Sequence, residues 1–141
     1  MIGLVILTHG QMATACLHSA DMIIGPVPAC LALSIDRSCS VEVATRELAV
    51  AISEVGADGD GALILTDLFG GTPTNIAAEF LAESAVEILT GFNLPMLIKA
   101  ASAREGKPLA ELTDFLREYG QQSILRPADF LKVQPQKPEL G

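Results

Sequence analysis

The chain alternates between short runs of consecutive apolar residues and longer stretches in which apolar residues recur at helical spacing. Consecutive apolar runs are typical of strands that are buried on both faces of a parallel sheet. They predict four strands, over residues 2–7, 29–35, 62–66 and 86–90. The helical spacing predicts five helices, over residues 11–24, 40–55, 73–83, 94–103 and 108–119.

Strands that alternate with helices at this spacing predict an α/β fold with a doubly wound, mainly parallel sheet and helices on both of its faces. We expect the strand order 2-1-3-4. Residues 122–126 (QSILR) predict one more short strand at the end of the domain. The domain is expected to span residues 1–127, and residues 128–141 to form a proline-rich, disordered tail.

The composition narrows the classes of partner. The chain has 141 residues, which suits one domain, and a formal net charge of −8. Such an acidic protein binds nucleic acids and anionic membranes poorly, so we expect neither and look for a basic partner. No apolar run approaches the roughly 18 residues of a membrane span, and membrane insertion is not expected.

The cysteines and the N-terminus indicate the compartment. The three cysteines are odd in number and lack CxxC spacing, which predicts small buried apolar residues in a reducing environment. The N-terminal residues MIGLVIL have no basic segment and are too short for a signal peptide. We therefore expect a cytoplasmic protein.

Two strands end on polar residues that can do chemistry together. His9 follows the first strand and Asp67 follows the third. In the order 2-1-3-4 these strands are neighbours about 4.8 Å apart, at the switch point where such folds place their sites. An imidazole is a competent nucleophile toward phosphorus, and a carboxylate on one ring nitrogen orients it. Gly10, next to the histidine, leaves the imidazole accessible.

The segment after Asp67 has the features of an anion site. Gly70 and Gly71 allow backbone amides to approach a phosphate closely. Thr72 is expected to be the N-cap of the next helix and Pro73 its first residue, so the helix N-terminus would face the phosphate. Phosphoryl transfer needs mainly positioning and charge stabilisation, and we expect neither a metal nor another cofactor.

Each of these features alone is usually structural, since a histidine, an aspartate or a GGTP segment after a strand is common in turns and helix caps. Their combination at neighbouring strand ends favours a site. His18 lacks this context and is expected to be exposed in mid-helix. Arg37 follows the second strand at the same edge and is expected to be a solvated charge.

Three ordered motifs resemble a known family. LVILTHG, LTDLFGGTPTN and TGFNLPML together resemble the enzyme IIA component of the mannose family of the phosphoenolpyruvate–sugar phosphotransferase system, over roughly residues 1–127. The resemblance implies a homodimer in which a C-terminal strand is exchanged between subunits. It also implies a histidine that takes phosphate from the phosphocarrier HPr and passes it to a IIB protein for sugar uptake and phosphorylation.

Residue by residue, the resemblance makes His9 the phosphorylated histidine and Asp67 the carboxylate that holds its ring. Gly70, Gly71 and Thr72 match the loop around the phosphate. Asn93 and Pro95 match a family loop near the site, without a defined chemical role.

The sequence also departs from the family pattern. Thr74 stands where many members carry a larger apolar residue. No IIB domain follows in this sequence, so IIB is expected to act in trans. The alternatives are a stand-alone regulatory phosphocarrier, the phosphoryl-donor subunit of dihydroxyacetone kinase, and a phosphomutase or phosphatase with an RHG motif. In the last case Thr8 stands in place of the phosphate-clamping arginine.

Overall fold

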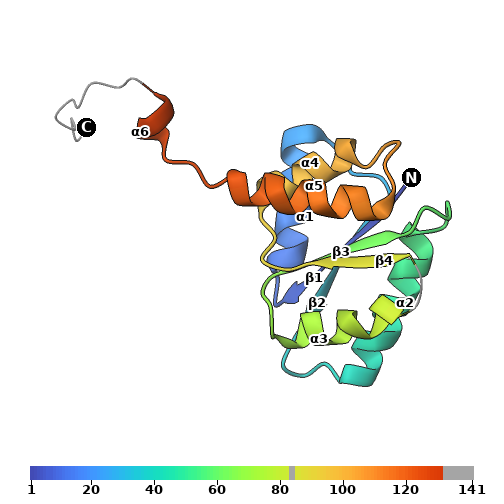
Figure 1. The fold of residues 1–141 in the computed structure, drawn as a ribbon. Coiled ribbons are helices and arrows are strands. Elements are labelled where there is room, and N and C mark those ends of the chain that lie inside the picture. Colours follow the sequence, from blue (N-terminus) through green and yellow to red (C-terminus); the bar gives the residue numbers. More distant parts are fainter. Residues whose placement is uncertain (83–84, 132–141) are drawn as a thin grey trace.

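The computed structural model describes residues 1–82 and 85–131 and contains a four-stranded sheet (Figure 1). All strand pairs are parallel and the order is β2-β1-β3-β4, as the sequence predicted. The strands are β1 (Gly3–His9), β2 (Cys30–Ile35), β3 (Ala62–Thr66) and β4 (Val86–Leu89).

Helices cover both faces of the sheet (Figure 1). One layer contains α1 (Met12–Ile24), α4 (Leu94–Ala103) and α5 (Leu109–Gln122). The opposite layer contains α2 (Val41–Val55) and α3 (Thr72–Ala78), and α3 continues into the 3-10 helix η1 (Glu79–Ala82). A last helical turn, α6 (Pro127–Phe130), follows.

The two layers follow from the alternation of side chains along the central strand. On β1, Leu4 and Ile6 pack into the cluster beneath α1, α4 and α5, whereas Val5 and Leu7 pack into the cluster beneath α2 and α3. All four side chains are fully buried. A strand that is covered on both faces can be apolar at every position, which explains the continuous apolar run in the sequence.

The strand register sets the position of the carboxyl-terminal loops. Leu7 of β1 lies opposite Thr66 of β3, so His9, the last residue of β1, and Asp67, which follows β3, lie at the same edge of the sheet. The amide of Gly10 donates a 3.0 Å hydrogen bond to the carbonyl of Ile35, which ties the end of β1 to the end of β2. Backbone pairing alone therefore fixes the positions of the strand ends at this edge.

Helix α5 is longer than the pattern predicted, because Gly120 does not end it. This glycine is buried against α4: a Cβ built on it would lie 2.4 Å from the Cε of Met96. Its carbonyl accepts a 3.0 Å hydrogen bond from the side-chain amide of Asn93. Gly120 thus allows two helices to approach closely, and this tertiary contact outweighs its low helix propensity.

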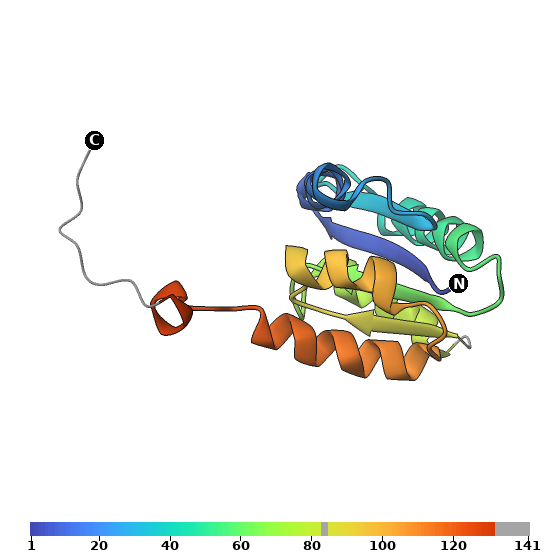
Figure 2. The same ribbon diagram turned by 90° about the horizontal axis from the view of Figure 1, so that it is seen from above.

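The strand predicted over residues 122–126 is wrong for the single chain. Gln122 ends α5, and residues 124–126 have no regular structure. Figures 1 and 2 both show this segment leading away from the body of the molecule to α6. The predicted domain boundary falls at α6, and residues 132–141 of the predicted tail lie outside the described residues.

Other expectations concern the cysteines and the membrane. Cys16, Cys30 and Cys39 form no disulfide and are only partly buried, less so than predicted. Burial raises the pKa of Cys30 to about 11 despite the opposing charge of Arg104. Among the described residues, no helix is both long and apolar enough to span a bilayer.

Candidate functional site

His9 and Asp67 meet at the carboxyl edge of the sheet. The Nδ1 atom of His9 lies 2.8 Å from Oδ2 of Asp67, and the backbone amide of His9 donates a 3.0 Å hydrogen bond to the same oxygen. The other carboxylate oxygen, Oδ1, accepts a 3.0 Å hydrogen bond from the amide of Leu68. Three donors therefore fix the carboxylate, and the carboxylate fixes the imidazole.

The protonation state of this pair follows from the carboxylate. Burial acts to raise the pKa of Asp67, but the hydrogen bonds and the charge of His9 outweigh burial and hold the pKa below its ordinary value of 3.8. An ionised carboxylate only accepts hydrogen bonds, so the proton between the two groups is on Nδ1. The lone pair of the neutral ring is then on Nε2. The His9 side chain is 49% exposed and that of Asp67 only 9%, so a reaction partner can reach the imidazole while Asp67 stays covered.

Gly71 lies directly against the imidazole. A Cβ built on Gly71 would lie 2.8 Å from Cε1 and 3.4 Å from Nε2 of His9, although the backbone of Gly71 (φ −90°) suits any residue. Gly70 is a glycine for the opposite reason: its φ of +90° strains other residues, while a side chain there would meet open space. Gly71 thus leaves space for the imidazole, and Gly70 allows the turn in the backbone.

The start of α3 differs from the prediction by one residue. Gly71, not Thr72, is the N-cap, and its carbonyl accepts the first helical bond from Asn75. The prediction for Thr72 was wrong because a glycine preceding it already has the extended conformation that an N-cap needs. Thr72 is exposed, and its hydroxyl makes no hydrogen bond to the part of the chain that the structure describes.

The remaining polar residues named from the sequence have structural positions. Thr8 is fully buried, and its hydroxyl accepts a 2.8 Å hydrogen bond from the amide of Ala13 in the first turn of α1. Asn93 caps α4 by accepting a 3.0 Å bond from the amide of Met96, and Pro95 lies in the first turn of that helix. Arg37 and His18 are exposed. The buried, hydrogen-bonded Thr8 cannot replace the arginine of an RHG phosphate clamp.

Sequence reasoning missed the apolar surface of the two site loops. Phe69, Leu68 and Met12 are 84%, 49% and 43% exposed. Leu68 and Phe69 lie in the loop that follows Asp67, and Met12 is the first residue of α1, shortly after His9. Exposed apolar side chains that gather beside a reactive group can form a contact surface for a partner. The signal available in the sequence was the pair Leu68–Phe69, which lies between a polar strand end and two glycines and continues neither neighbouring pattern.

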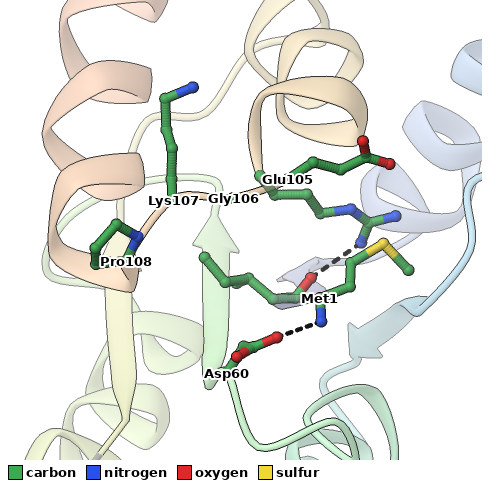
Figure 3. A pocket seen from close by; sticks show the side chains of 8 residues that line it. Met1, Asp60, Glu105, Gly106, Lys107 and Pro108 are labelled. Atoms are coloured by element: carbon green, nitrogen blue, oxygen red, sulfur yellow. Dashed lines mark hydrogen bonds and ion pairs between the residues drawn. The ribbon is translucent and has the colours of Figure 1, made fainter.

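A pocket of about 470 Å³ lies at the opposite, amino-terminal edge of the sheet (Figure 3). There the Met1 amine pairs with Asp60, and the buried Arg104 donates hydrogen bonds to the carbonyls of Ile2, Pro28 and Ala29. The seven residues of β1 put this pocket roughly 20 Å from His9. The guanidinium closes the base of the sheet, and this pocket contains neither a histidine nor a cysteine.

The comparisons with known proteins agree with one another. Residues 3–116 match the family model described as PTS system fructose IIA component, where PTS denotes the phosphotransferase system. Over 125 residues the chain is 32% identical to the fructose-specific EIIA component of Bacillus subtilis, covering 88% of this chain and 85% of that protein. Over 114 residues it is 31% identical to the sorbose-specific EIIA component of Lacticaseibacillus casei, covering 80% and 81%.

A solved structure shows the same fold. The mannose/sorbose-specific IIA subunit of Enterococcus faecalis superposes with a TM-score of 0.78 at 27% identity, over 99% of this chain and 98% of that one. The fold is thus that of a IIA component of the phosphotransferase system. The chain belongs to the mannose-, fructose- and sorbose-type family of these components.

Asp67→Asn tests the electrostatic description of the pair. Since the folded-state pKa of Asp67 is depressed, its ionised form stabilises the native protein above pH ~4, and this contribution is lost as the pH falls through the folded-state pKa. We expect the variant to be less stable by about 1–3 kcal/mol at pH 6, because a carboxylate with three donors is replaced by an amide. Urea unfolding at pH 6 and pH 3 should show the difference shrinking at pH 3. The exposed Asp36→Asn serves as the control, and an equal difference at both pH values would contradict the description.

Gly71→Ala tests the close contact with the imidazole. The new methyl group cannot be accommodated 2.8 Å from Cε1, so we expect the ring to move and the Nδ1–Asp67 bond to lengthen. In ¹⁵N NMR spectra, the ring-nitrogen signals of His9 should move toward a mixture of tautomers. Gly70→Ala is the matched control, since it adds backbone strain of about 1–2 kcal/mol but no contact. Wild-type His9 signals in Gly71→Ala would show that the contact does not hold the ring.

Proposed function

We propose that this protein is a phosphohistidine carrier that takes a phosphoryl group from phospho-HPr onto His9 and passes it to a IIB protein during sugar uptake. The observation that carries the proposal is the half-exposed imidazole whose Nδ1 is held by the buried carboxylate of Asp67 at 2.8 Å. The family membership supports it, because the relatives are IIA components of such systems. The reaction would take place in the cytoplasm.

We propose that the chemistry takes place at Nε2, because Asp67 holds the other ring nitrogen. In the proposed step, the Nε2 lone pair of His9 attacks the phosphorus of the phosphohistidine on HPr. The new N–P bond forms as the donor's N–P bond breaks, and the electron pair of that bond returns to the donor imidazole. The proton on Nδ1 stays in place, so the His9 ring gains positive charge, which the Asp67 carboxylate stabilises. In the transfer to IIB, the acceptor group of IIB attacks the phosphorus, the N–P bond on His9 breaks, and its electron pair returns to Nε2.

The phosphoryl group would be bound by backbone amides and one hydroxyl. Gly71 lies against the imidazole, and Gly70 precedes it with a φ of +90°, so we propose their amides as donors to a group on Nε2. Thr72, the next residue, is exposed, and Gly10 (φ +55°), which follows His9, has no side chain that could cover the imidazole. Positioning and charge stabilisation of this kind suffice for phosphoryl transfer, and the proposal requires no metal or other cofactor.

The docking surface for the two carriers would be the exposed apolar side chains of the site loops. Leu68 and Phe69 in the loop after Asp67, and Met12 at the start of α1, are exposed and would contact the partner. The net charge of −8 favours association with a basic protein such as HPr. Both carriers would use the same surface in turn, because HPr must bring a phosphoryl group to the imidazole and IIB must take it from the same imidazole.

We also propose that the protein acts as a homodimer in which residues 123–131 pack against the other subunit. These residues lead away from the body, and Ile124, Leu125, Phe130 and Leu131 are all exposed. A groove of about 590 Å³ runs beside β4, an edge strand of the sheet, and its lining includes Leu81, Ile88 and Leu89. An unpaired edge beside an apolar groove accepts an added strand.

His9→Ala tests the carrier function. After incubation with phosphoenolpyruvate, enzyme I and HPr, the intact mass of the wild type should increase by one acid-labile phosphoryl group, and the mass of His9→Ala should not change. The matched control is His18→Ala, because His18 is the only other histidine and is exposed on α1. It should accept phosphate at the wild-type rate.

Two outcomes of this experiment would contradict the proposal. Failure of the wild type to accept phosphate from a cognate HPr would exclude the carrier function, and acceptance by His9→Ala would exclude His9. A stand-alone regulatory carrier would accept the same group on His9 but fail to pass it to IIB. Adding purified IIB and following the loss of phosphate from the protein separates these two functions.

Truncation after Gln122 tests the dimer. The full chain, of 14.8 kDa, should sediment as a species of twice that mass, whereas the truncated chain should be monomeric. The fold should persist, because α5 and the sheet are intact in the shorter chain. A variant with Phe130→Ser and Leu131→Ser keeps the length but removes apolar area, and it should weaken the dimer. A full-length chain that is monomeric at high concentration would refute this part of the proposal.

A further inference from the structure

We propose that Thr74 is a positioning residue for His9, which acts through the Leu68 peptide and the Asp67 carboxylate to keep the Nε2 lone pair of the imidazole exposed. The consequence for phosphoryl transfer rests on the proposed function. The positioning itself does not, and it can be measured without any transfer reaction.

A continuous chain of hydrogen bonds joins the interior of the protein to the imidazole. The hydroxyl oxygens of Thr66 and Thr74 lie 2.7 Å apart, and the Thr74 hydroxyl donates a 2.7 Å hydrogen bond to the carbonyl of Leu68. The amide of Leu68 binds Oδ1 of Asp67 at 3.0 Å, and Oδ2 of Asp67 accepts from His9. Every link is within ordinary hydrogen-bond distance.

The direction of each bond is determined by the acceptors. A carbonyl oxygen cannot donate, so the single hydroxyl proton of Thr74 goes to Leu68. The bond between the two threonines must then be donated by Thr66. Thr66 is fully buried and Thr74 is 7% exposed, so water does not readily replace either partner. The hydrogen bonds therefore run in one direction, from the Thr66 hydroxyl to the Thr74 hydroxyl and from there to the Leu68 carbonyl.

The Leu68 residue is held from both sides as a result. Its carbonyl is bound by Thr74 and its amide by Asp67, although the Leu68 side chain is exposed and contributes no buried anchor. Asp67 Oδ1 in turn has the Leu68 amide as its partner, and this bond sets the rotation of the carboxylate about its side-chain axis. That rotation decides whether Oδ2 lies in the plane of the imidazole, where it can accept from Nδ1.

The pair of threonines explains the departure from the family pattern at position 74. An apolar side chain there could fill space but could not bind the Leu68 carbonyl. In this protein the bonded pair Thr66–Thr74 holds the loop after Asp67 through a directional hydrogen bond to Leu68, where an apolar residue would only pack against it. Phe69, the next residue, is 84% exposed and buries little apolar surface, so the bond from the Thr74 hydroxyl to the Leu68 carbonyl ties this loop to α3.

The test compares Thr74→Val with two matched variants. Thr74→Val keeps the shape of the side chain and removes both hydrogen bonds. Thr74→Ser restores the hydroxyl. Thr66→Val removes one equally buried hydrogen bond but leaves the bond from Thr74 to Leu68 in place, so it controls for the loss of a buried bond as such.

The primary measurement is the ¹⁵N NMR spectrum of the imidazole of His9 in each full-length protein. Wild type, Thr74→Ser and Thr66→Val should show a single tautomer with the proton on Nδ1, and Thr74→Val a mixture of both tautomers. With phospho-HPr in single-turnover experiments, we expect the rate of phosphate acceptance by Thr74→Val to fall by about tenfold, which is typical of a small misplacement of a reacting group. The dependence of this rate on pH should also differ from that of the wild type.

The outcomes distinguish this proposal from the carrier function. A single Nδ1-protonated tautomer in Thr74→Val would overturn the positioning role, and so would an equal effect of Thr66→Val. If the wild type accepts no phosphate, the carrier function fails, but the tautomer measurement still decides the role of Thr74. Should Thr74→Val not fold, Thr74→Ala combined with the Thr74→Ser comparison provides the same test.

Discussion

The 2.8 Å contact between Nδ1 of His9 and Oδ2 of Asp67 joins two loops that are 58 residues apart in the sequence. It can form only because β1 and β3 are adjacent and in a register that ends both strands at one level. A shift of one residue would turn either side chain to the other face of the sheet. The contact in turn gives the imidazole one tautomer and one exposed nitrogen, on which the proposed chemistry depends.

The rest of the molecule can be understood as the support for that contact. β1 is buried on both faces, by α1 on one side and by α2 and α3 on the other, so the backbone that carries His9 has little freedom to move. The support continues in polar form at the edge of the sheet. Thr8 holds the first turn of α1, and Thr74 holds the loop that carries Asp67. Buried hydroxyls suit this role because their bonds are directional, whereas apolar packing alone tolerates small rotations.

At the site, the exposed groups are those that the proposed function brings into contact with other proteins. The imidazole edge, Phe69 and Leu68 face solvent, while the carboxylate and the threonines beneath them are covered. The proposed carrier exchanges a phosphoryl group with two different proteins, and a shared apolar surface around one nucleophile would serve both. The far edge of the sheet differs in kind: there the guanidinium of Arg104 binds three backbone carbonyls and supports the fold.

The sequence by itself determined the strand order, the two helical layers and the meeting of His9 with Asp67, since apolar periodicity and polar strand ends are local signals. It misplaced features that depend on contacts between distant segments. Gly120 continues α5 because Met96 packs against it, and residues 122–126 form no strand in the chain alone because no neighbouring strand is available. Only the tertiary structure decided that Gly71 faces the imidazole and that Thr74 binds Leu68, because such contacts depend on side-chain direction, which residue spacing does not encode.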